Sequence, residues 1–149
     1  MVDEKVRATG RHWLLAVSMA SAGLLMGTVP WGAWAQTGLE ATATRSSVEQ
    51  GVTVKVTAKS MGLAGGRWEF AVVLDTHSAD LSDDLAKSAL LTTHDGRTFR
   101  PTEWLGAPPG GLYREGVLAF DVTAPRPGAI ELRIDRLGES APRTFHWQL

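Results

Sequence analysis

The chain of 149 residues contains no cysteine. This absence excludes disulfide bonds, cysteine nucleophiles, thiolate zinc sites, blue-copper sites and lipid attachment at a cysteine. The stability of the fold must therefore come from packing of its interior, even in an oxidising compartment.

The chain also lacks a large excess of either charge, with 15 Lys and Arg against 16 Asp and Glu. Residues 36–149 hold 12 basic and 14 acidic side chains, two more acidic than basic. A surface without a basic excess does not favour nucleic acid or an anionic membrane as a partner. We therefore expect neither nucleic-acid binding nor membrane binding by this part of the chain.

Motifs of familiar enzymes are missing as well. There is no G-x-S-x-G nucleophile elbow and no glycine-rich phosphate loop. His77 and Ser78 are adjacent, so their side chains point to opposite faces of a strand and cannot form a nucleophile–base pair. Carboxylate pairs such as Asp83 and Asp84 could flank a glycosidic bond, but surface charge is their usual explanation. We predict that the protein is not an enzyme, with a paired-carboxylate hydrolase as the alternative.

The N-terminal segment has the pattern of an export signal. Residues 1–12 are basic at three positions, residues 13–29 are uncharged, and an A-x-A site follows at residues 33–35. This pattern predicts a signal peptide over residues 1–35, with cleavage after Ala35, and an uncleaved membrane anchor is the alternative. We therefore expect the protein to be periplasmic or extracellular, with no membrane attachment after cleavage.

The remainder is long enough for one domain, and its apolar residues follow the period of β-strands. Residues 36–50 are small and polar, which favours a flexible lead-in, with a first edge strand at its end as the alternative. Asp95-Gly96 lies between two β-prone arms and predicts a hairpin. Apolar and polar residues alternate in the segments 52–58, 67–75, 116–122, 129–137 and 143–149.

The strand pattern predicts the fold class of residues 51–149. About seven strands with frequent turn signals, and no helix of three turns, are typical of an antiparallel β-sandwich of immunoglobulin-like type. A small closed barrel is the alternative. A short helical turn could follow Ser82. The expected large core residues are Trp68, Phe70, Phe120, Phe145 and Trp147.

The stretch FAVVLDTHSADLSDDL, residues 70–85, suggests two interpretations. Asp75 and His77 share one outward face of a strand, and His94 beside the hairpin turn could join them in a copper or zinc site. The alternative is structural, because Asp and Ser commonly satisfy backbone N–H groups at strand ends. The spacing fits no known metal motif, so we favour the structural interpretation and expect no cofactor.

A second unusual stretch is EWLGAPPGGLYREG, residues 103–116. Its aromatic and proline residues could form an exposed surface for a partner, with Trp104, Tyr113 and Arg114 as the contact residues. The alternative is that Trp104 packs under the loop while the glycines serve the turn geometry. Tryptophan is usually mostly buried, which favours this alternative.

Two motifs occur together: LDTHSADL at residues 74–81, and W-x-G-x-x-x-GG-x-x-x-x-G-x-L-x-F at residues 104–120. With the closing aromatic strand FHWQL, they resemble a family of small exported bacterial domains without an assigned function. The resemblance covers the chain from about Val72 onward. It implies an exported β-sandwich and a role for Asp75, His77 and Ser78, but it implies no activity.

The chain departs from that family at one informative place. The family often has His-His after the paired glycines, whereas this chain has Leu112-Tyr113. The change removes two metal ligands and favours a structural role for the first motif. Asp75 and Ser78 would hold the loop, and His77 would bridge to the glycine-rich segment.

We therefore expect an exported accessory or binding domain. Its loops at residues 75–84 and 104–116 would contact an unknown protein or envelope component. A periplasmic copper or zinc handling protein that uses His77, His94 and Asp75 is the alternative.

Overall fold

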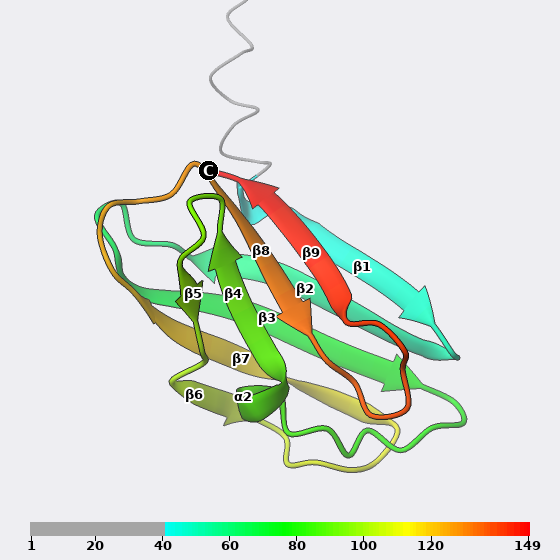
Figure 1. The fold of residues 1–149 in the computed structure, drawn as a ribbon. Helices are drawn as coiled ribbons and strands as arrows, with labels where there is room; N and C mark the ends of the chain where they lie inside the picture. Colours follow the sequence, from blue (N-terminus) through cyan, green and yellow to red (C-terminus); the bar gives the residue numbers. More distant parts are fainter. Residues whose placement is uncertain (1–40) are drawn as a thin grey trace, which may run out of the picture.

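The computed structural model describes residues 41–149, which form two antiparallel β-sheets packed face to face (Figure 1). One sheet has five strands in the order β1-β2-β3-β7-β6, and the other has four in the order β5-β4-β8-β9. The strands are β1 (Thr44–Glu49), β2 (Val52–Ser60), β3 (Gly66–Thr76), β4 (Ala89–Thr93), β5 (Thr98–Phe99), β6 (Glu103–Gly106), β7 (Tyr113–Val122), β8 (Ala129–Ile134) and β9 (Arg143–Gln148), and a four-residue helix, α2 (Leu85–Ser88), precedes β4.

The core lies between the two sheets and is built from the inward-facing residues of the alternating segments. Along β3, every second side chain from Trp68 to Leu74 is fully buried. The Phe70 ring meets Phe120 edge-on, with 5.7 Å between ring centroids, and lies 5.5 Å from the Trp147 ring. All five aromatic residues expected in the core are buried, so the predicted β-sandwich and its core are confirmed.

The hairpin predicted at Asp95-Gly96 joins β4 to the short edge strand β5. Gly96 has a φ of 85°, the left-handed conformation that favours glycine in such turns. The backbone N–H of Gly96 donates to the Thr93 carbonyl, and the N–H of Thr93 donates to Arg97.

The structure differs from the prediction at two strands. Residues 41–149 contain nine strands rather than about seven, because Thr44–Glu49 and Glu103–Gly106 also pair with neighbours. The first of these lies in the expected lead-in, so the edge-strand alternative holds for that segment. The second adds an edge to the five-stranded sheet beside β7. The expected signal peptide lies outside the described residues.

The short helix after the LDTHSADL segment agrees with the helical turn predicted there, and Asp84 is its N-cap residue. Among residues 41–149, no helix has the length and apolar character needed to cross a membrane.

Candidate functional site

Two loops at one end of the sandwich are joined by backbone hydrogen bonds. They are residues 77–84 after β3 and residues 107–112 before β7, and we call their common face the paired-loop surface. The N–H of Thr76 donates to the Leu112 carbonyl at 2.9 Å, and the N–H of Leu81 donates to the Gly111 carbonyl at 3.1 Å. In the other direction, the N–H of Gly110 donates to the Leu81 carbonyl at 2.8 Å. The two segments expected to contact a partner therefore form one surface.

Thr76 organises the first loop from inside the fold. It shares the inward parity of Leu74 and is only 3% exposed. Its hydroxyl donates to the Gly51 carbonyl at 3.0 Å and accepts from the N–H groups of Ser78 and Ala79. The hydroxyl therefore connects the turn between β1 and β2 to the LDTHSADL segment.

The carboxylate of Asp80 connects the first loop to the second, because it accepts a hydrogen bond from the N–H of Gly111 at 2.9 Å. Asp75 and His77 are exposed, as their outward parity predicts. Thr76 and Asp80, rather than Asp75 and Ser78, therefore hold the loop.

Arg114 lies beneath the paired loops and is 1% exposed. Its guanidinium donates to the carbonyls of Leu81 and Asp83 at 2.9 and 2.7 Å, and to Ala107 at 3.2 Å. Burial lowers the pKa of Arg114, yet a guanidinium remains charged at neutral pH. The prediction that Arg114 contacts a partner does not fit this position, because the side chain supports the loops from below.

A buried ionic network fixes the same end of the sandwich to β9. Asp83 accepts two hydrogen bonds from Arg136, and the second arm of Arg136 reaches Glu139 at 3.0 Å. Glu139 also binds Arg143, at 2.7 and 2.6 Å. These four side chains are at most 4% exposed, so each charge depends on its neighbours for solvation.

Arg143 carries this network to the first two strands. Its guanidinium donates to the carbonyls of Ser47 and Val52 at 3.2 and 3.1 Å, and to the Glu49 carbonyl at 2.8 Å. The turn between β1 and β2, the loop at residues 77–84 and the loop at residues 135–142 are thus joined through buried arginines. These hydrogen bonds hold the residues beneath the paired-loop surface in fixed positions.

Two large exposed side chains, Leu112 and Tyr113, lie where the loop at residues 107–112 enters β7. Leu112 and Tyr113 are 54% and 55% exposed. The Tyr113 hydroxyl donates to Glu115 at 2.7 Å. This hydrogen bond, then partial burial and the negative charges of Glu115 and Asp75, raise the pKa of Tyr113, so the phenol is neutral at physiological pH.

Trp104 packs under the loop at residues 107–112, as the structural alternative for this residue predicts. The indole is half-buried, packs against the core and donates from Nε1 to the Ala107 carbonyl at 2.9 Å. The Arg114 guanidinium lies 5.6 Å from its ring centroid. Trp104 therefore stabilises the loop at residues 107–112 and offers little area to a partner.

The three expected metal ligands lie at two different ends of the sandwich. Asp75 is at the end of β3 and pairs with Tyr113. His94 follows β4, and its Nδ1 accepts a hydrogen bond from the N–H of Gly128 at 3.3 Å. Gly128 belongs to the loop that follows β7. The last residue of β7, Val122, pairs with Gly66, the first residue of β3, so this loop begins at the start of β3.

The length of β3 shows whether these three residues can bind one metal ion. Asp75 is nine residues from the start of that strand, which is roughly 30 Å. Figure 1 shows the ends of β3 and β4 on different sides of the molecule. Asp75 and His77 therefore cannot share an ion with His94. In residues 41–149, no three His, Cys, Asp or Glu side chains lie close enough together to hold a metal.

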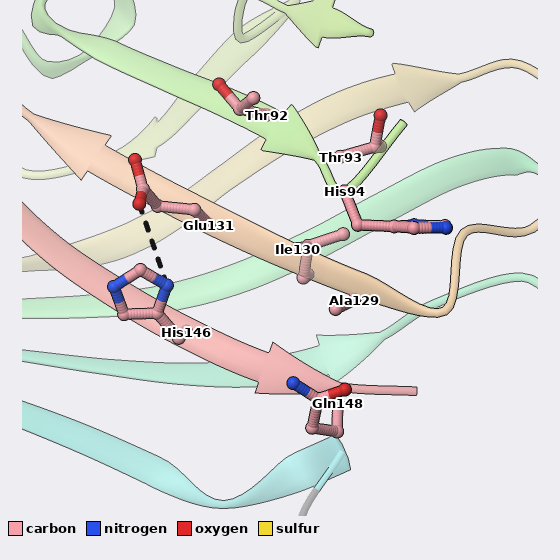
Figure 2. Close-up of a pocket in the computed structure, with 8 residues that line it drawn as sticks. All are labelled: Thr92, Thr93, His94, Ala129, Ile130, Glu131, His146 and Gln148. Carbon is pink, nitrogen blue, oxygen red and sulfur yellow. Dashed lines mark ion pairs between the residues drawn. The ribbon is translucent and has the colours of Figure 1, made fainter. Parts of the chain in front are cut away.

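His94 instead borders a shallow hollow of about 260 Å³ on the outer face of the four-stranded sheet. Figure 2 shows His146 turned toward Glu131, whereas the ring of His94 points away from both. Nδ1 of His146 lies 3.6 Å from the Glu131 carboxylate. The hollow thus contains one weak histidine–carboxylate pair and no converging set of ligands.

The burial of Arg114 and Arg143 could have been predicted from their positions in the sequence, provided that the strand predicted at residues 116–122 is extended back to Arg114. Arg114 shares the parity of Leu118 and Phe120 along β7, and Arg143 shares that of Phe145 and Trp147 along β9. Inward parity at a strand end, combined with a charged residue, indicates a buried charge that needs partners.

Comparisons of the chain with protein-family models, with curated proteins and with solved structures give no match. The fold and the site geometry are therefore the basis for the proposals that follow.

Proposed function

We propose that the protein is an exported binding domain that holds a protein or envelope component on its paired-loop surface. The observation that carries this proposal is the exposure of Leu112 and Tyr113 where the loop at residues 107–112 enters β7, beside the loop at residues 77–84 that is fixed to it and to the buried Arg114. Exposed apolar side chains bordered by polar residues are typical of protein-binding sites.

The chemistry of the surroundings suggests the character of the partner. Asp75 on β3 lies directly opposite Tyr113 on β7, and Asp80 accepts the N–H of Gly111, the residue before Leu112. A partner with an apolar contact residue and basic residues around it would complement this surface. Because the loops are already ordered by hydrogen bonds, binding would cost little conformational entropy.

The proposal is tested with the variant Leu112→Ser. The matched control is Leu63→Ser, because Leu63 is 84% exposed but lies near the start of β3, at the opposite end of the sandwich. Proteins captured from the envelope fraction would be quantified by mass spectrometry, with and without a chelator. We expect a partner that is retained by wild type and by Leu63→Ser and lost with Leu112→Ser. Equal capture by all three proteins would contradict the proposal.

Export is the second part of the proposal and is tested separately. N-terminal sequencing of the protein from the exported fraction should start at Gln36, because cleavage is expected after Ala35. An intact Met1 would show that the segment is retained.

A further inference from the structure

The outer face of the five-stranded sheet carries an apolar band that the described residues leave uncovered. Ala71, Val73 and Val117 are half-buried on this face, and Leu105 at the edge is 48% exposed. The register places Ala71, Val117 and Leu105 in one row across three strands. A hollow of about 450 Å³ lies over this band. The outer face of an antiparallel sheet is usually polar, so the band suggests a contact.

Opposite charges flank the band within a single row. Lys55 on β2 lies directly opposite Val73 on β3, and Val73 lies directly opposite Glu115 on β7. All the side chains of this row point outward, and Lys55 and Glu115 are exposed. The row therefore runs from positive through apolar to negative over three strands, about 10 Å in all.

We propose that two copies of the chain associate through this face in a symmetric dimer. The two-fold axis runs parallel to β3 and lies between the five-stranded sheets of the two copies. It places β2 of one copy over β7 of the other. Lys55 of each copy then faces Glu115 of its partner, and Val73 packs against Val73. The same row supplies both halves of two identical ion pairs, which is the self-complementarity that a two-fold interface requires.

The size of the face sets the strength of the association. Five strands with five or six residues each cover roughly 20 by 20 Å on each copy, or about 800 Å² for the two copies together, which is the size of a weak, transient interface. We therefore expect a weak dimer that forms only at high protein concentration.

Two acidic residues on the outer face of β3 oppose the dimer in this arrangement. Asp75 lies two residues beyond Val73 and Glu69 two residues before Ala71, so the axis brings each toward the same residue of the partner. Glu69 is paired with Arg67 of its own strand, whereas Asp75 is the exposed one of the two. Like charges across an interface weaken it. Asp75→Asn should therefore lower the dissociation constant.

The dimer surface differs from the paired-loop surface, and Tyr113 lies at their boundary. Leu112 belongs to the loops, whereas Lys55 and Glu115 belong to the sheet face. The dimer does not depend on the proposed function, and the variants keep the two apart.

The test is a charge exchange measured by sedimentation velocity over a concentration series, on protein purified after expression of the full chain. We expect wild type to dimerise and Lys55→Glu or Glu115→Lys alone to raise the dissociation constant at least about tenfold, because like charges then face each other. The double variant K55E/E115K should return to within about threefold of wild type, because it restores opposite charges.

Two controls accompany the charge exchange. Tyr113→Phe removes the hydrogen bond to Glu115 without changing its charge and should leave the dimer intact. Arg133→Glu reverses a charge on the outer face of the other sheet and should also have no effect. Circular dichroism confirms that each variant is folded.

A wild-type protein that stays monomeric at about 1 mM, a concentration at which even a weak dimer is populated, would overturn the proposal. Single variants that dimerise like wild type would also overturn it. So would a double variant that stays as weak as the single ones, or a loss of the dimer in Arg133→Glu.

Discussion

The guanidinium of Arg136 donates two hydrogen bonds, at 2.9 and 2.8 Å, to one carboxylate oxygen of Asp83, which is 53 residues away in the chain. The other oxygen of Asp83 accepts the backbone N–H of Leu137 at 2.7 Å. Asp83 is 2% exposed, so this pair connects the loop at residues 77–84 to the loop at residues 135–142 inside the protein.

Asp83→Asn should therefore be strongly destabilising. The amide cannot accept the same charge-assisted hydrogen bonds, and the buried Arg136 would be left without its main counter-charge. We expect a loss of about 3–5 kcal/mol in the free energy of unfolding, measured by urea denaturation. Asp84→Asn is the matched control, because Asp84 pairs with Lys87 at the surface and should change stability little. Equal effects of the two variants would contradict this role of Asp83.

The stability of the fold should depend on pH through Glu139. Hydrogen bonds from Arg143, together with the charges of Arg143 and Arg136, lower the pKa of Glu139 despite its burial. A carboxyl whose folded pKa is depressed contributes stability above its unfolded pKa, and this contribution is lost as pH falls through the folded pKa. The loss therefore begins near pH 4.5, the ordinary value for a glutamate, and grows below it.

Glu139→Gln removes this titration. The variant should be less stable than wild type at neutral pH, and its free energy of unfolding should fall less steeply below pH 4.5. The measurement is chemical denaturation from pH 3 to 7. Parallel curves for the two proteins would show that Glu139 does not contribute to acid sensitivity.

Thr76 should be essential for the order of the paired loops. Thr76→Val keeps the shape of the side chain but removes three hydrogen bonds, including those to the N–H groups of Ser78 and Ala79. We expect a loss of about 1–3 kcal/mol and faster hydrogen exchange at residues 77–80. Thr76→Ser keeps the hydroxyl and should preserve most of the exchange protection. Unchanged exchange in Thr76→Val would rule out this role.

Gly116 and Gly106 face each other beneath the indole of Trp104. A Cβ on Gly116 would lie 2.6 Å from Cα of Gly106 and 2.7 Å from the Trp104 ring. Gly116→Ala should therefore displace Trp104 and destabilise the protein by about 1–3 kcal/mol, with a change in tryptophan fluorescence. Gly128→Ala is the control, since its nearest contact would be His94 at 3.8 Å. A Gly116→Ala protein as stable as wild type would show that β6 can shift at no cost.

The sequence allowed the central part of the fold to be predicted. Alternation of apolar and polar residues marks β2, β8 and β9, and the apolar residues at every second position of β3 and β9 place Trp68 and Trp147 inside. The short strand β6 was missed because four residues before a proline–glycine loop carry too little periodicity. The pair of Asp83 and Arg136 was missed because no local pattern connects residues so far apart in the chain.

The candidate site was predicted in part. Both loops were identified from the polar and glycine-rich composition of their sequences, and the structure shows that they are adjacent. The roles within them were not, because Thr76 and Arg114 act through backbone carbonyls and N–H groups of other segments. Such partners become known only when the register of β3 with β7 is known.

The proposed function requires that the paired-loop surface binds a partner. A photo-crosslinking amino acid introduced at Leu112, with Leu63 as the reference position, tests it most directly in cells that express the full chain. Binding at this surface should give a discrete crosslinked product at position 112 that is absent at position 63. Crosslinking at position 63 but not at position 112, or at neither position, would contradict the proposed function.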